Sequence, residues 1–282
     1  MPNCISCGRE LPHSDDPQNI CPDCRAAIAD RSPSQNPLPG RRSLNLAMMP
    51  VTSVIIGINL IVFVAMVFSG VSLLEPQNAD LIRWGANTGA HTLSVQPWRM
   101  LTSNYLHVGL IHILLNMWCL WNLGVLAESL LGRWTYLASY LATGAGAGLL
   151  SLAVKPLQVS AGASGAVFGL AGVLLTGLYF SKLAIPRSAL QGTIRSVGLF
   201  AFYNLIIGFS IPAINNTAHL GGLVTGLILG LAMAPVLSRP KDQRAIGNLA
   251  IITVASLLLL GGFLTVRHLQ EHIVSLRVEL RH

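Results

Sequence analysis

Four polar side chains in otherwise apolar stretches have the residue types that acyl transfer needs. They are Ser164, in the segment Gly162-Ala-Ser-Gly165, His219, and the pair His112 and Asn116, four residues apart. A serine hydroxyl becomes a nucleophile when a neighbouring base accepts its proton, and histidine is the usual base. We therefore expect Ser164 to be the nucleophile and His219 the base. The expected oxyanion donors are Asn116, His112 and the backbone N–H of Ser164.

Each of these residues also has a purely structural explanation. In membrane helices, serine permits close helix packing, and histidine or asparagine forms hydrogen bonds between helices. A metal site on the two histidines would lack a nearby carboxylate or an HExxH spacing. The Gly-x-Ser-x-Gly turn of α/β-hydrolases does not fit, because Gly165 comes one position early and the surroundings are predicted to be helical.

The elements that carry these residues are predicted to be membrane-spanning helices. Only 10% of the residues are charged and mean hydropathy is +0.59, whereas soluble domains carry about 25% charged residues. Apolar runs close to the ~20 residues that span a bilayer recur along the chain. The seven expected spans, of which the fifth is the shortest, are Val51–Leu74, Val108–Leu130, Trp134–Val154, Ala163–Ser181, Val197–Ile211, Ala218–Leu237 and Asn248–Val266. Glycines every four residues in the fourth and sixth spans favour close packing of these two helices.

The distribution of basic residues predicts the orientation in the membrane. Most of the 18 Lys and Arg residues precede the first span or fall in alternate loops on the same side. The positive-inside rule then places the N-terminus in the cytoplasm and the C-terminus outside. In that orientation the even-numbered spans run inward, so the four polar residues share one depth near the outer face. The net charge of +7 reflects this bias and some attraction to anionic lipid. Nucleic-acid binding is not expected, since no basic cluster is interleaved with aromatic residues.

Acidic residues offer no obvious third member for a catalytic triad. Of the 11 acids, only Glu128 lies in a predicted span, and it falls at the cytoplasmic end. It is therefore too far from His219. Glu75 and Asp80 lie in the predicted outer loop and remain formal candidates, but the sequence favours a Ser–His pair over a Ser–His–Asp triad.

The N-terminal segment contains two CxxC pairs. They are Cys4 and Cys7, and Cys21 and Cys24. Four thiolates at this spacing can surround a structural zinc ion, which would supply the folding energy that so small a segment lacks. The alternative is a pair of disulfides, but thiols stay reduced on the predicted cytoplasmic side. We expect a zinc-ribbon-like domain over residues 1–30 and a linker rich in Pro and Ser over residues 31–50.

Several of these motifs together resemble the rhomboid family of intramembrane serine proteases over about residues 50–235. Gly162-Ala-Ser164-Gly165 resembles the GxSG motif of the family, and His219-Leu-Gly-Gly resembles the motif of its catalytic histidine. His107-Val-Gly-Leu-Ile-His112-Ile-Leu-Leu-Asn116 resembles the HxxxxHxxxN pattern of its second helix. Trp98-Arg99 resembles the WR pair of its outer loop.

The resemblance implies a fold and an activity. The fold is an all-α polytopic membrane protein with a six-helix catalytic core over residues 51–237, followed by a seventh helix and a short outer tail over 238–282. The activity is cleavage of membrane-spanning substrate proteins near their outer ends through an acyl-enzyme, with no cofactor for catalysis. Ser164, His219, Asn116 and His112 take the roles assigned above, with Gly162 and Gly165 supporting the serine. Phe168 stands where many members have a tyrosine stacked on the catalytic imidazole, and we expect the stacking to persist.

Two other classes of function remain as alternatives. A rhomboid-like binding or quality-control factor would keep the fold with weak or no peptidase activity. A transporter is disfavoured, because the spans hold no deep charge and show no inverted repeat. An outward-facing site combined with cytoplasmic zinc suits a bacterial plasma membrane.

Overall fold

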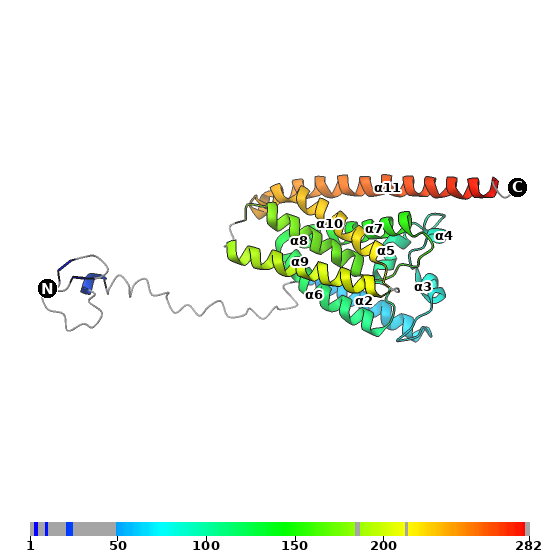
Figure 1. The fold of residues 1–282 in the computed structure, drawn as a ribbon, viewed down its shortest axis with the longest axis horizontal. Helices are drawn as coiled ribbons and strands as arrows, with labels where there is room; N and C mark the ends of the chain where they lie inside the picture. Colours follow the sequence, from blue (N-terminus) through cyan, green and yellow to red (C-terminus); the bar gives the residue numbers. More distant parts are fainter. Residues whose placement is uncertain are drawn as a thin grey trace. The chain divides into compact units, whose positions relative to one another are not determined.

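The computed structural model describes residues 3–4, 9–10, 21–24, 49–183, 187–211 and 214–279 of the 282-residue chain. The chain divides into two compact units, Met1–Met48 and Met49–His282. The expected linker falls almost entirely outside the described residues. The second unit contains the bundle of helices (Figure 1).

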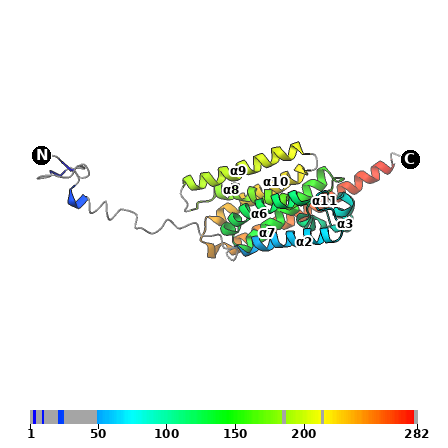
Figure 2. The same ribbon diagram turned by 90° about the horizontal axis from the view of Figure 1, so that it is seen from below.

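The described part of the second unit is built on seven long helices. They are α2 (Pro50–Phe68), α6 (Leu110–Leu131), α7 (Arg133–Val154), α8 (Ser164–Phe180), α9 (Arg187–Ser210), α10 (Asn216–Leu237) and α11 (Ala245–Glu279). Six of them are long and apolar enough to cross a membrane, and α8 is a shorter apolar helix of 17 residues. The expectation of an all-α polytopic membrane protein is therefore confirmed. In Figure 2, α9 lies at one edge of the bundle and α2 at the other.

Three of the expected spans have the wrong bounds. The first helix ends at Phe68 and not at Leu74, because Gly70 adopts φ of +92° and the N–H groups of Gly70 and Val71 cap the last turn. The fifth helix is not the shortest, since it begins at Arg187 with a polar first half that an apolar window misses. The seventh continues to Glu279, because its C-terminal part is polar yet helical and an apolar window misses it.

The segment between α2 and α6 is folded into short helices. They are α3 (Asn78–Trp84), α4 (Gly89–Thr92), α5 (Arg99–Thr102) and the 3₁₀ helix η2 (Ser103–Tyr105). Arg99 is buried and donates to the carbonyls of Ile82 and Ala86 at 2.6 and 3.1 Å. Asn87 and Ser160 exchange backbone hydrogen bonds of 3.0 and 2.9 Å. This loop therefore holds the chain in place just before Ser164.

Helices α8 and α10 pack with their backbones in contact. A Cβ added at Gly222 would lie 1.9 Å from the carbonyl oxygen of Gly165, and one added at Gly226 would lie 2.0 Å from that of Gly169. Only glycine leaves room for such an approach. The glycine spacing thus brings the beginnings of the two helices together.

Glu128 links the end of α6 to the beginning of α2. Its carboxylate accepts hydrogen bonds from the backbone N–H groups of Val51 and Thr52 at 3.1 and 2.8 Å, and from the Thr52 hydroxyl at 2.8 Å. A carboxylate is favourable at a helix N-terminus, where N–H groups have no intrahelical acceptor. Glu128 lies 16 residues, or about 24 Å of helix, beyond His112. It is therefore a structural residue at the other end of the bundle.

Candidate active site

The hydroxyl of Ser164 and the imidazole of His219 are in hydrogen-bond contact. Ser164 is the first residue of α8, His219 lies in the first turn of α10, and Ser164 Oγ is 2.8 Å from His219 Nε2. The separation of 55 positions in the sequence is bridged by the close contact of α8 with α10. The distance is within the range that a nucleophile–base pair requires.

Gly162 shapes the turn that leads to Ser164. Its φ is +133°, which L side chains rarely adopt, and a Cβ there would lie 2.8 Å from Cε1 of His112. The Gly162 N–H donates to the carbonyl of Ser103 at 2.9 Å. The glycine therefore lets the chain pass between His112 and Ser164. Gly165, the other glycine expected to support the serine, faces Gly222 of α10 as described above.

His219 is held from two further sides. The ring of Phe168 stacks on the imidazole, with centroids 4.4 Å apart and planes at 18°. On the other edge of the imidazole, Nδ1 lies 3.1 Å from Oδ1 of Asn216. If Nε2 accepts the proton of Ser164, Nδ1 carries the ring hydrogen and donates it to this amide oxygen.

Asn216 is the residue of the site that the sequence analysis missed. It is buried, and its Nδ2 donates to the carbonyl of Leu205 in α9 at 3.2 Å, which leaves Oδ1 turned to His219. The search for a third member considered only acids, whereas the structure places an amide there. The sequence signal for this contact was the spacing of Asn216 and His219, since residues three apart share one face of a helix.

His112 and Asn116 lie in the wall of the same cavity as Ser164 and His219, a cavity of about 370 Å³. His112 Nδ1 accepts a hydrogen bond from the Val108 N–H at 3.1 Å, so the ring hydrogen is on Nε2. One N–H of Asn116 Nδ2 donates a hydrogen bond to the carbonyl of His112 at 2.9 Å, and the second N–H is not used in this bond. Both residues thus have a donor left for a ligand in the cavity.

Uncharged groups surround this cavity. Its described lining contains no Asp, Glu, Lys or Arg side chain. Next to His112 lies His107, which is fully buried; the two rings are tilted at 56° to each other, with centroids 5.3 Å apart. Burial, reinforced by the repulsion that two protonated imidazoles at His107 and His112 would feel, lowers the pKa of His107 to about 3. A low local dielectric of this kind strengthens hydrogen bonds to an oxyanion.

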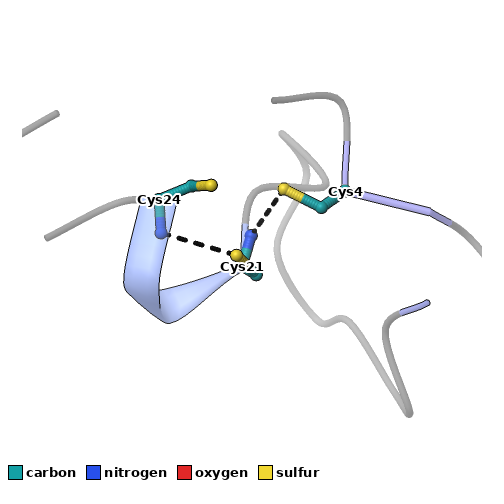
Figure 3. A group of neighbouring side chains, drawn as sticks. All are labelled: Cys4, Cys21 and Cys24. Atoms are coloured by element: carbon teal, nitrogen blue, oxygen red, sulfur yellow. Dashed lines mark hydrogen bonds between the residues drawn. The ribbon is translucent and has the colours of Figure 1, made fainter. Parts of the chain in front are cut away.

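The N-terminal unit brings three of the four expected zinc ligands together. The sulfurs of Cys4, Cys21 and Cys24 all lie within 4.8 Å of one another (Figure 3). The Cys21 N–H donates to Cys4 Sγ at 3.2 Å, and the Cys24 N–H donates to Cys21 Sγ at 3.4 Å. Thiolates that share one zinc ion, at about 2.3 Å each, fit such a cluster. Cys7 lies outside the described residues.

Comparison with known proteins identifies similar chains. The family model of the Rhomboid domain matches residues 94–236, about half of the chain, a range that includes all the residues of the cavity site. Rhomboid protease GluP of Bacillus subtilis is 29% identical over 200 residues, covering 71% of this chain and 38% of that protein. RHOMBOID-like protein 4 of Arabidopsis thaliana is 36% identical over 136 residues, covering 48% and 34%. Rhomboid protease AarA of Providencia stuartii is 29% identical over 267 residues, covering 84% and 92%. The chain thus spans little more than a third of the first two relatives and most of the third.

Proposed function

The chain belongs to the rhomboid family, and we propose that it is an intramembrane serine endopeptidase. The observation that carries the proposal is the 2.8 Å contact between Ser164 Oγ and His219 Nε2 in a cavity that also contains unused hydrogen-bond donors. Two of the similar proteins are named rhomboid proteases, which supports the same class of reaction.

In the proposed reaction, Ser164 Oγ attacks the carbonyl carbon of the scissile peptide bond while His219 Nε2 accepts the hydroxyl proton. The carbonyl π pair moves onto oxygen, which becomes an oxyanion. His219 then donates the proton to the leaving nitrogen, and the C–N bond breaks to leave an ester on Ser164. Water attacks this ester with His219 again as base, which releases the new carboxyl group and restores the hydroxyl.

The proposed roles of the other residues depend on the hydrogen bonds that each can donate or accept. The backbone N–H of Ser164 is in the first turn of α8, where it has no intrahelical acceptor and the helix dipole favours negative charge. Together with the second amide hydrogen of Asn116 and the Nε2 hydrogen of His112, it would stabilise the oxyanion. Asn216 would hold the Nδ1 hydrogen of His219, and Phe168 would fix the plane of the ring.

The proposed substrates are membrane-spanning segments of other proteins. Apolar side chains of α6 and α9 line the cavity and are also more than half exposed on the surface of the bundle; they are Ile111, Leu115 and Ile207 at 72, 58 and 53%. Such a lining suits an apolar chain entering from lipid. We also propose a plasma membrane, as in bacteria, with the N-terminus in the cytoplasm and the cavity near the outer face, on the basis of the positive-inside rule.

We propose that the N-terminal unit binds one structural zinc ion through Cys4, Cys7, Cys21 and Cys24. The donor set supports this assignment, because three sulfurs converge, and those of Cys4 and Cys21 accept backbone N–H bonds that favour the thiolate form. The zinc would stabilise this unit and take no part in peptide hydrolysis.

Cleavage of a single-span substrate in liposomes tests the proposed activity. We expect the wild type to cleave it, and Ser164→Ala and His219→Ala to lose cleavage while retaining the thermal midpoint of the wild type. Ser160→Ala is the matched control, because Ser160 lines the same cavity four residues away and its hydroxyl has no role in the reaction.

Labelling with a fluorophosphonate provides the second readout. Wild type and Ser160→Ala should be labelled, and Ser164→Ala should not. Cleavage that survives in Ser164→Ala would refute the serine mechanism. A folded wild type that neither cleaves nor reacts with the probe would instead indicate a rhomboid-like binding protein.

A further inference from the structure

A second cavity lies at the opposite end of the bundle from Ser164. It has a volume of about 470 Å³ and is enclosed by the end of α6, the beginning of α7, the 3₁₀ helix η3 (Lys241–Gln243) and the beginning of α11. α6 begins beside the active-site cavity and ends at this one. About 30 Å of hydrocarbon separates the two faces that a helix of this length connects.

Three cationic side chains line this cavity without an acidic partner. They are Arg133, Lys241 and Arg244. The cavity lining contains no Asp or Glu, and none of the three has an ion pair with a described residue. Arg244 is buried and donates to the carbonyls of Arg239 and Leu130 at 2.8 and 3.2 Å. These bonds fix the guanidinium in place but leave its charge uncompensated.

Two helix N-termini at this cavity also favour negative charge. α7 begins at Arg133 and α11 begins at Ala245, and both first turns line the cavity. The N-cap of α7 is Gly132, which has no side chain to accept a hydrogen bond, and neither first turn contains an acidic residue. The N–H groups of these turns and the positive ends of both dipoles therefore favour an anion in the cavity.

Asn248 provides an independent sign that a polar ligand belongs here. It lies in the cavity wall, is only 5% exposed, and donates through Nδ2 to the Thr135 hydroxyl at 3.2 Å. Its Oδ1 is buried and has no hydrogen-bond partner. A buried acceptor without a donor is unfavourable by about 1–3 kcal/mol, so a ligand hydroxyl that the oxygen meets after a rotation of the amide would relieve it.

One side of the lining is apolar and lies on the surface of the bundle. Trp134 and Leu249 are 80 and 68% exposed on the surface of the bundle, and Leu130 and Ile252 complete this side. Tryptophan at such a position is typical of the boundary between headgroups and hydrocarbon. The cavity thus has a cationic interior and an apolar rim.

We propose that this cavity binds one anionic phospholipid with a hydroxylated headgroup, such as phosphatidylglycerol, in the leaflet opposite the active-site face. The phosphate would contact Arg133, Lys241, Arg244 and the two helix N-termini. A headgroup hydroxyl would donate to Asn248 Oδ1, and the acyl chains would lie along Trp134 and Leu249. Basic cavities between membrane helices are known to suit anionic headgroups. The proposal is independent of the peptidase activity.

Native mass spectrometry of the delipidated, full-length protein in detergent tests the proposal. The protein is titrated with phosphatidylglycerol, phosphatidic acid, phosphatidylcholine or inorganic phosphate. We expect one tightly retained phosphatidylglycerol per chain. The double variant Arg133→Gln/Lys241→Gln should bind it about 25-fold more weakly, fivefold for each charge, which corresponds to ~1 kcal/mol per basic residue. Arg133 makes no side-chain hydrogen bond in the structure, so the single variant Arg133→Gln keeps the fold and should still show its fivefold loss.

Arg195→Gln is the matched control, because it removes the same charge from an exposed position on α9 that does not line the cavity. It should bind like the wild type. Equal loss in this control, or equal binding of phosphatidylcholine, would overturn the proposal. Displacement by inorganic phosphate at the same concentration would also overturn it, because the site would then take free phosphate. Asn248→Leu should abolish a preference for phosphatidylglycerol over phosphatidic acid, and absence of this preference in the wild type would refute the role of Asn248.

Discussion

Substitution of Asn216 by alanine tests whether an amide can serve as the third member of the catalytic group. In the resting site, the bond of 3.1 Å between His219 Nδ1 and Asn216 Oδ1 joins two neutral groups, which contributes about 0.5–1.5 kcal/mol. When His219 takes the proton of Ser164, the same bond becomes charge-assisted and contributes about 1.5–3 kcal/mol. Only a bond that strengthens in the transition state accelerates the reaction. The difference of about 1–1.5 kcal/mol between the two bonds is the transition-state stabilisation that is lost, so we expect kcat to fall by about 5- to 13-fold, with little change in KM.

The assay is cleavage of a single-span substrate in liposomes, measured against pH. Asn216→Asp keeps the acceptor and adds a negative charge, so it should restore part of kcat and move the acid limb of the pH profile upward. Asn122→Ala is the control, because Asn122 bonds only to its own helix at the carbonyl of Trp118. A kcat for Asn216→Ala within about twofold of the wild type would refute the reasoning. So would a loss of kcat that Asn216→Asp does not change in magnitude or pH dependence.

Three other predictions follow from the structure. Gly222→Ala places a Cβ 1.9 Å from the Gly165 carbonyl oxygen, so it should lower the free energy of unfolding by about 1–3 kcal/mol or more and reduce cleavage. Gly57→Ala is its control, because a Cβ there meets no atom within 4 Å. This variant should change neither the thermal midpoint nor kcat. His107 has a folded pKa of about 3 against an ordinary 6.5 because of burial. The unfolded chain therefore binds more protons than the folded chain between these two pH values. The stabilisation is fully present above pH 6.5, and the free energy of unfolding should fall by about 1.4 kcal/mol per pH unit on acidification below it. Unfolding scans of His107→Gln should show a smaller slope. Purified protein should contain one zinc per chain by elemental analysis and Cys4→Ser should lose it; a zinc-free wild type prepared with zinc in the medium would contradict the ligand set.

The helical architecture was predictable because it depends on local composition. Long apolar runs with few charges have few structural outcomes in a bilayer, and the GxSG and His-Leu-Gly-Gly motifs placed Ser164 and His219 at the starts of two helices. The bounds were predicted less well where hydropathy and helix formation disagree. The first half of α9 is polar yet helical, and Leu74 is apolar yet lies beyond the glycine turn that ends α2.

The remainder of the site depends on tertiary contacts that spacing does not specify. Asn216 is oriented by the Leu205 carbonyl of a different helix, so its role appears only once α9 is packed against α10. The second cavity was missed for a related reason. Arg133 and Arg244 were interpreted only as topology signals, since no motif in the sequence indicates that these two residues share one cavity.

The backbone contact between α8 and α10 fixes the distance between Ser164 Oγ and His219 Nε2. Gly165 follows Ser164 directly, and Gly222 is three residues beyond His219, so the contact lies within one helical turn of both reacting atoms. A slip of α10 by a single residue would shift it about 1.5 Å and rotate it by about 100°. In one direction Leu223 would replace Gly222 against the Gly165 carbonyl, and in the other Thr225 would replace Gly226 against the Gly169 carbonyl. The two helices thus have one permitted register. Thinning of the bilayer or tilting of the outer helices should therefore change the Ser164–His219 distance very little.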